Sequence, residues 1–260
     1  MMDAKALNGL IAYRSSLLEE SSVEHAFFTR LGGVSTGPFG SLNVGGTVGD
    51  DPSHVDENLR CVLGALRWQA SRVVSGFQVH GERIHRVEAK DAGRVIPATD
   101  ALVSDVPGLL LLGRYADCVP VALWDPVRQV VGLAHAGWRG TVRRIAAKTV
   151  AAMAELFGSH PQDLRAAIGP SIGPCCFEVG DEVLQAFEDA FPGNAADVID
   201  RPGHRVDLWR ANASQLAQSG VQKVDVAELC TSCQVDRFYS HRREHGATGR
   251  FAVVIGIRSE

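Results

Sequence analysis

Short apolar runs recur along the chain, and each is bounded by glycine, proline or charged residues. Runs of this length and composition are typical of β-strands rather than helices. We therefore predict strand structure at residues 25–30, 73–79, 83–88, 101–104, 109–124, 129–135 and 251–257. Asp117 interrupts the longest of these runs, directly before Cys118. Adjacent strand residues point to opposite faces, so Asp117 is expected to support a turn or a neighbouring side chain.

Apolar residues at helical spacing predict four amphipathic helices. The first begins within residues 51–56, where Ser53 and Asp56 have the spacing of a capping box. The second is expected to run to Phe157. Thr141 is its expected N-terminal cap, and Gly158 is expected to end it. The other two are expected at residues 180–191 and 208–217.

Strands and helices follow one another through all 260 residues without a repeat, a low-complexity tract or an obvious linker. This organisation predicts one α/β (α+β) domain that spans residues 1–260 and contains a mixed sheet. The hydrophobic fraction of 45% is ordinary for a globular chain. A sizeable core can therefore be buried.

Charge and apolar content exclude several classes of partner. The chain has 30 acidic and 26 basic residues, a net charge of −4, so no global basic field attracts nucleic acid or a membrane surface. The first twenty residues lack the pattern of a signal peptide. No apolar run approaches the roughly 18 residues that span a bilayer. We expect a cytoplasmic monomer without a nucleic-acid or membrane partner.

Three potential metal ligands lie at or near the ends of predicted strands: His80, Cys118 and His135. Neutral imidazole and thiolate are ligands that Zn²⁺ prefers, and three protein ligands leave a fourth position open for catalysis. Taken singly, each residue is more often a packed core residue. Small residues around them, including Gly81 and Gly140, favour the ligand interpretation because the backbone can turn sharply there.

The other cysteines have weaker signals. Cys61 lies off the apolar stripe of its helix, and we assign it no chemistry. Vicinal cysteines rarely bridge each other without strain, so we interpret Cys175 and Cys176 as packing thiols. Cys230 and Cys233 form a CxxC pair, a rival metal or redox motif. No second CxxC or histidine pair stands at zinc-finger spacing, so a structural role for the pair is favoured.

Several polar side chains are candidates for substrate binding. Arg139 lies at the predicted start of a helix close to His135, a combination that suits phosphate. The alternative role for Arg139 is a surface ion pair. Asn43 ends a long glycine-rich loop. Its side chain is expected either to face the active site or to stabilise a turn of that loop. Arg243 and Arg250, in the loop before the last strand, suit an anionic or polar substrate group.

A set of motifs extends from about residue 25 to the end of the chain. They are FTRLGGVSTGP at 28–38, SLN at 41–43, VGDDP at 48–52, QVHG at 78–81, ADCVPV at 116–121, HAGWRG at 135–140, IGPSIG at 168–173 and FYSHRR at 238–243. In identity and order these resemble the YfiH family, also called multicopper polyphenol oxidases, laccase-domain proteins or purine nucleoside phosphorylases. The resemblance implies a layered α/β/β/α architecture.

The resemblance also implies a reaction. It points to phosphorolysis of adenosine, inosine, guanosine and methylthioadenosine and to hydrolytic deamination of adenosine, with zinc held by His80, Cys118 and His135. The partners would be a purine nucleoside and phosphate, with Arg139 a candidate for the phosphate. Zinc deaminases carry an H-x-E pairing for proton transfer. Here Gly81 and Glu82 follow His80, which leaves the acid/base group open.

Three other functions remain. Amide hydrolysis of a cell-wall precursor, an editing role of bacterial family members, would use the same metal and the basic late loop. Copper oxidation of polyphenols is disfavoured because the nine histidines include no H-x-H pair, although copper can occupy a Cys-His₂ site. A metal-stabilised binding module with a fourth protein ligand is the non-enzymatic alternative.

Overall fold

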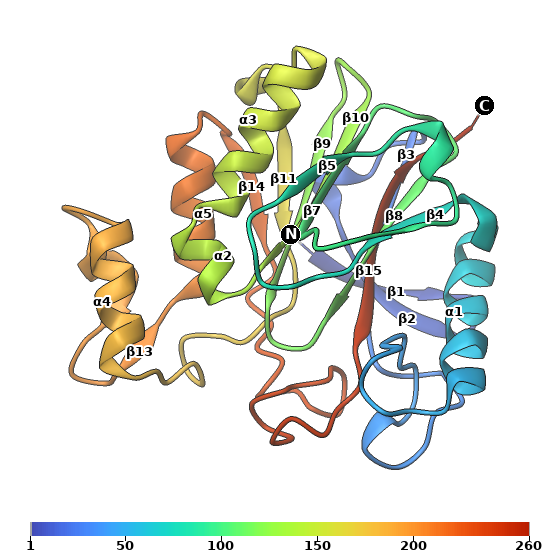
Figure 1. Ribbon diagram of the computed structural model, residues 1–260, viewed down its shortest axis with the longest axis horizontal. Helices are drawn as coiled ribbons and strands as arrows, with labels where there is room; N and C mark the ends of the chain where they lie inside the picture. The colour runs from blue at the N-terminus through green and yellow to red at the C-terminus, as the bar shows by residue number, and fades with distance from the viewer. Residues whose placement is uncertain (1, 260) are drawn as a thin grey trace.

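Two mixed β-sheets lie face to face in the computed structural model, which describes residues 2–259 (Figure 1). Within these residues the first sheet has seven strands, in the order β1 (Met2–Leu7), β2 (Leu10–Ser15), β3 (Val23–Phe28), β15 (Phe251–Ile257), β8 (Leu110–Tyr115), β4 (Val73–Gly76) and β6 (Val95–Ile96). Strand β4 is parallel to both β8 and β6, and the other pairs are antiparallel.

The second sheet carries two of the three predicted metal ligands at its strand ends. Its order is β14 (Lys223–Val226), β11 (Arg165–Ile168), β9 (Val119–Asp125), β10 (Val130–Ala136), β7 (Ala101–Ser104) and β5 (Ile84–Arg86). The pairs β11·β14 and β5·β7 are parallel, and the rest are antiparallel. A separate small hairpin pairs β12 (Ile199–Asp200) with β13 (Arg205–Val206).

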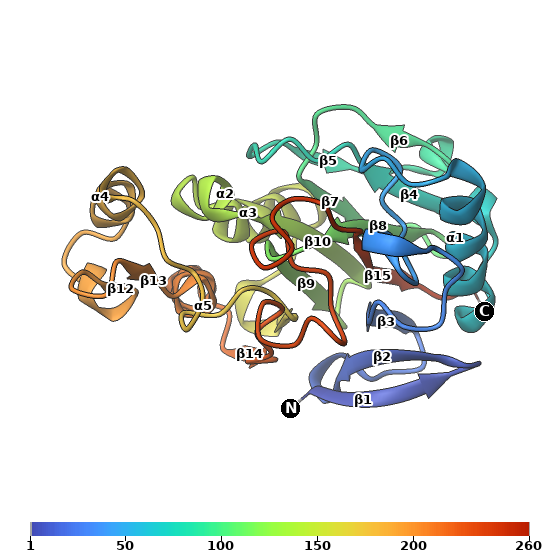
Figure 2. The same ribbon diagram turned by 90° about the horizontal axis from the view of Figure 1, so that it is seen from below.

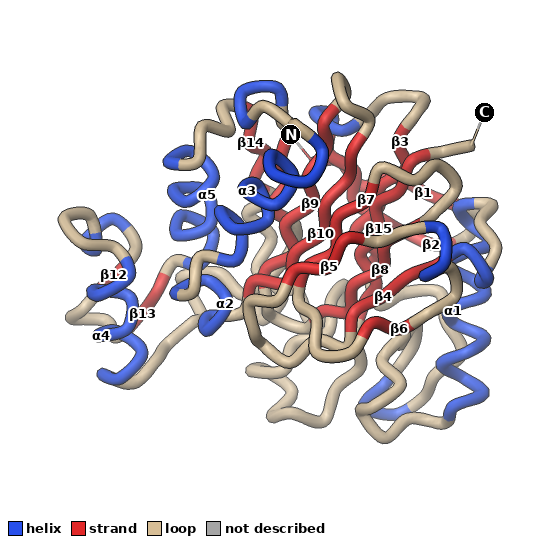
Figure 3. Tube along the Cα trace, turned by 45° about the horizontal axis from the view of Figure 1, so that its top comes forward, coloured by secondary structure: helices blue, strands red, loops and turns tan. Residues whose placement is uncertain are grey.

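Helices cover the outer faces of both sheets. Helix α1 (Pro52–Leu66) lies against the first sheet, and α2 (Trp138–Val142), α3 (Ile145–Phe157) and α5 (Leu208–Gln218) lie against the second (Figures 1 and 3). Helix α4 (Asp181–Ala190) and the small hairpin form the edge farthest from α1 (Figure 2). The mixed α/β fold with an α/β/β/α arrangement of layers is thus confirmed. Among the described helices, none combines the length and apolar character that crossing a membrane requires.

The alternation of side chains along each strand separates the apolar layers. Phe27 and Val253 point into the core between the two sheets, whereas their neighbours Phe28 and Val254 pack toward α1. A third core, which includes Met153, lies between the second sheet and its helices. Both faces of the central strands are therefore buried, and their sequences read as continuous apolar runs.

Two details of the predicted helices are wrong. The side chain that caps α1 is Asp51, which accepts a hydrogen bond from the backbone N of Ser53 at 2.8 Å. The predicted helix from Thr141 is two helices, because α2 already begins at Trp138 and Arg144 has a left-handed φ of 62° that separates it from α3. The buried Thr141 hydroxyl instead accepts a hydrogen bond from Asn212.

Candidate metal centre

His80, Cys118 and His135 come together at one point. His80 lies in the loop after β4, Cys118 in the turn between β8 and β9, and His135 near the end of β10. One donor atom of each residue lies within 4.8 Å of a donor atom of the other two, and the imidazole centroids are 4.9 Å apart. His80 is exposed and His135 is buried, so the cluster lies at the border between core and solvent.

The loop that carries His80 is fixed to the first sheet by Gln78. The side-chain amide of Gln78 donates to the carbonyl of Arg114 at 3.1 Å and accepts from the backbone N of Arg114 at 3.0 Å. The side chain thus makes the pair of hydrogen bonds that a residue of an adjacent strand would make. His80 itself has a φ of 58°, which few non-glycine residues adopt. The imidazole of His80 lies beside that of His135.

Asp100, directly before β7, connects two of the three ligands and was not predicted from the sequence. Its Oδ1 accepts hydrogen bonds from Nδ1 of His135 at 2.8 Å and from the backbone N of His80 at 2.9 Å. Its Oδ2 accepts from the backbone N of Gly81 at 2.8 Å and of Val79 at 3.2 Å. The carboxylate thus orients the His135 ring and leaves its Nε2 for a metal.

Charge within the cluster favours the metal-binding form of the thiol. Burial raises the pKa of Cys118, but attraction to His135 and hydrogen bonds from His135 and His80 outweigh it and lower the pKa to about 6. Burial lowers the pKa of His135, while Cys118 and Asp100 raise it to about 9. Burial also raises the pKa of Asp100, but the bond from His135 and the backbone donors keep it below its usual value. Cys118 is therefore a thiolate at neutral pH.

Gly137 packs against the centre. A Cβ at this position would lie 2.9 Å from Sγ of Cys118 and 3.0 Å from Cδ2 of His80. Gly137→Ala should therefore displace the ligands, and because overpacking costs about 1–3 kcal/mol, zinc affinity should fall roughly 5- to 150-fold. Competition with a chromophoric chelator measures this. Gly46→Ala, where a Cβ meets open space, is the control; equal zinc affinity in the two variants would contradict the predicted packing.

The three predicted arginines have different settings. Arg139 is exposed, with its guanidinium 4.3 Å from the centroid of the Trp138 ring. Arg243 is exposed as well. Arg250 is partly buried, and its Nη1 donates to the carbonyls of Thr248 and Gly249. Burial lowers its pKa, while the negative charge of Cys118 opposes that shift, so Arg250 is electrostatically coupled to the centre.

Asn43 is fully buried and organises its own loop. Its Oδ1 accepts from the backbone N of Gly45 and of Arg250, each at 2.8 Å, and its Nδ2 donates to Asp50 at 2.8 Å. These bonds join the long loop to the segment that carries Arg250. A direct contact of Asn43 with substrate stays a prediction.

Asp117 has the supporting role expected for it. It adopts a φ of 81°, and its carboxylate accepts from Thr231 Oγ1 at 2.7 Å and from the backbone N of Arg242 at 2.6 Å. Asp117 therefore orders two loops beside Cys118, while Asp100 orients the histidine. Glu82 is exposed and pairs with Lys148 on α3, which lowers the pKa of its carboxyl group.

Comparisons with known proteins identify the family. A family model described as multi-copper polyphenol oxidoreductase laccase matches residues 24–258. The purine nucleoside phosphorylase YlmD of Geobacillus stearothermophilus is 41% identical over 244 residues, covering 89% of each chain. A purine nucleoside phosphorylase of Deinococcus radiodurans is 42% identical over 237 residues, covering 91% of this chain and 90% of the relative.

A solved structure supports the same assignment. The crystal structure of the Bacillus licheniformis hypothetical protein YfiH superposes with a TM-score of 0.87 at 40% identity, covering 91% of this chain and 93% of the other. The similarity extends over the segments that supply His80, Cys118 and His135. The chain therefore belongs to the YfiH family of laccase-domain proteins, in agreement with its sequence motifs.

Proposed function

We propose that this protein is a zinc-dependent purine nucleoside enzyme with its active centre at His80, Cys118 and His135. Its proposed reactions are phosphorolysis of adenosine, inosine, guanosine and methylthioadenosine and hydrolytic deamination of adenosine. The observation that carries the proposal is the convergence of two imidazoles and one thiolate, with Asp100 bonded to one of the imidazoles. Relatives named purine nucleoside phosphorylase supply the class of substrate.

The donor set fits zinc. Imidazole and thiolate both occur as ligands in catalytic zinc sites, which have three protein ligands, whereas structural sites normally take four. Zinc held by these residues supplies a Lewis acid for the substrate and lowers the pKa of a coordinated water. Copper is the alternative occupant, because nitrogen and sulfur donors bind divalent copper more tightly than zinc.

The chain's own residues have three tasks in phosphorolysis. The C1′–N9 bond of the nucleoside breaks, a bond from C1′ to a phosphate oxygen forms, and the purine departs with a proton. Arg250 is the proposed cation whose charge interacts with Cys118, and we assign it to attracting phosphate toward the centre. Arg139 and Arg243 are the exposed cations proposed to complete the anion site. Asp100 keeps a proton on Nδ1 of His135 and so fixes the orientation of that ring.

The direct test is phosphate-dependent release of free base. Metal-loaded protein should release hypoxanthine from inosine when phosphate is present and form ribose 1-phosphate in equal amount, whereas omission of phosphate should stop the reaction. Chromatography of both products measures this. The nucleoside proposal falls if fully metal-loaded protein releases no base from any of the four nucleosides.

Arg139→Ala should separate the two proposed activities. Loss of one charge-assisted hydrogen bond to phosphate costs about 1.5–3 kcal/mol, so kcat/KM for phosphorolysis should fall roughly 10- to 150-fold. Deamination of adenosine uses water in place of phosphate and should change much less. Arg60→Ala, on the exposed face of α1, is the matched control. Equal losses in both activities would argue against a phosphate role for Arg139.

A second candidate function has one observation in its favour. Cys118, His135 and Asp100 have the contacts of a Cys-His-Asp triad, which would suit hydrolysis of an amide through a cysteine nucleophile. His80 argues for the metal, because a second imidazole on the same sulfur has no role in such a triad. Removal of metal by a chelator distinguishes the two: amide hydrolysis by a free thiolate would persist, whereas the zinc reaction would stop.

A further inference from the structure

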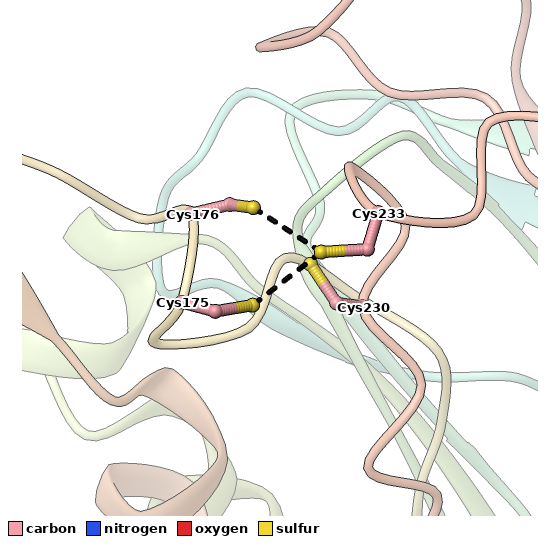
Figure 4. A group of neighbouring side chains, drawn as sticks. All are labelled: Cys175, Cys176, Cys230 and Cys233. Atoms are coloured by element: carbon pink, nitrogen blue, oxygen red, sulfur yellow. Dashed lines mark hydrogen bonds between the residues drawn. The ribbon is translucent and has the colours of Figure 1, made fainter.

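A second cluster of four cysteines lies outside the proposed active centre. Cys175 and Cys176 come from the turn after β11, and Cys230 and Cys233 come from the turn after β14 (Figure 4). The four sulfur atoms lie within 4.8 Å of one another. The sulfur of Cys233 is 3.6 Å from that of Cys175 and 3.4 Å from that of Cys176. The sequence did not predict that the vicinal cysteines and the CxxC pair meet one another.

The distances match a tetrahedral metal site better than a disulfide. Four thiolates at about 2.3 Å from one Zn²⁺ would stand about 3.8 Å from each other. The observed contacts of 3.4 and 3.6 Å are close to that value. A disulfide requires about 2.05 Å and would join only two of the four sulfurs. All six cysteines of the chain are free thiols in this structure.

Backbone hydrogen bonds hold the two cysteine-bearing segments in place. The N–H of Gly173 donates to Sγ of Cys230 at 3.2 Å, a bond that stabilises a thiolate. A parallel bridge pairs Ser171 with Cys230 and holds the two cysteine-bearing segments side by side. The turn of the CxxC pair is closed by a hydrogen bond from the N of Gln234 to the carbonyl of Cys230. These bonds organise the two segments before any metal binds.

We propose that Cys175, Cys176, Cys230 and Cys233 bind one Zn²⁺ in a closed, structural tetrathiolate site. Four sulfur donors with no other ligand in the cluster are the donor set of structural zinc. Burial decreases from Cys230, which is buried, to Cys175 and Cys233, which are exposed, so the ion has a path from solvent. A cavity of about 360 Å³ has Cys175 in its lining.

The proposed structural zinc is connected to the active centre through Asp117. Thr231, between the two cysteines of the CxxC pair, donates to one carboxylate oxygen of Asp117. Arg242 donates from its backbone to the other oxygen and from its guanidinium to the carbonyl of Cys176 at 3.2 Å. The ion would therefore hold in place the two loops that fix Asp117, which directly precedes Cys118.

Zinc content and the zinc-edge absorption spectrum of the 260-residue chain test this proposal. Wild-type protein purified under reducing conditions and supplied with Zn²⁺ should hold two ions per chain. The double variant His80→Ala/Cys118→Ala should retain one, with a scattering shell of four sulfurs at about 2.3 Å and no nitrogen. The double variant Cys175→Ser/Cys233→Ser should lose that shell, and Cys61→Ser, a thiol remote from both clusters, should keep both ions.

Two results would overturn the proposal. One is a fully reduced His80→Ala/Cys118→Ala variant that binds no zinc or shows nitrogen or oxygen in the shell. The other is a mass spectrum of the native chain with a disulfide within the four cysteines. Neither result depends on Cys175→Ser/Cys233→Ser being able to fold. Failure here would leave the nucleoside proposal unaffected, because base release is measured at the other centre.

Discussion

Cys118→Ala should remove the metal from the active centre and lower phosphorolysis at least about 100-fold. Its thiolate lies between both imidazoles and is the only sulfur among the three proposed ligands. Loss of a residue that merely supports a metal ligand typically costs 10- to 100-fold in metal affinity or activity, so loss of the ligand itself should cost more.

Metal content and kcat/KM should be measured together on this variant. Cys61→Ala, in α1 on the other side of the first sheet, controls for the loss of a thiol and should keep both quantities. A Cys118→Ala protein that has lost the ion of the active centre but retains phosphorolysis would end the metal-dependent account. A variant that retains the ion at His80 and His135 but loses activity would instead favour the cysteine-nucleophile alternative.

Asp100→Asn should weaken zinc binding about 10- to 100-fold while the fold persists. The carboxylate accepts four hydrogen bonds, from His135 and from the backbone of residues 79–81. An amide has one acceptor oxygen, and its NH₂ group would face donors. At least one N–H would lose its partner, at a cost of about 1–3 kcal/mol, and the His135 ring would lose its fixed orientation.

Asp91→Asn is a matched control for this variant. Asp91 is also a buried carboxylate, and it bonds to Nε2 of His85 at 3.2 Å and to the backbone N of Glu88 at 3.0 Å, outside the three-ligand cluster. Both variants should lose thermal stability, but only Asp100→Asn should lose zinc affinity. Equal zinc affinity in the two proteins would show that Asp100 has no part in holding the ligands.

The three metal ligands could be predicted from the sequence because each lies in a recognisable local pattern. His80, Cys118 and His135 stand where an apolar run ends and small residues follow or surround the turn. Strand ends in a layered fold meet at common edges, so local patterns of this kind transfer well to three dimensions. The strands at β7, β10 and β15 were predicted to within about one residue for the same reason.

Long-range partners had no comparable signal. Asp100 precedes a strand, a common place for an acidic residue, and its importance comes from contacts with residues 79–81 and 135. The vicinal cysteines and the CxxC pair are far apart in sequence, and neither has the spacing of a complete zinc motif. The hairpin β1–β2 was missed because β1 is an edge strand without an apolar run.

An anomalous difference map at the zinc absorption edge, from crystals of the wild-type protein, tests the central claim most directly. We expect a peak about 2.0–2.1 Å from one nitrogen each of His80 and His135 and about 2.3 Å from Sγ of Cys118, with a position left open toward solvent. Well-ordered density in which the three side chains surround no ion, in protein supplied with zinc, would contradict the account.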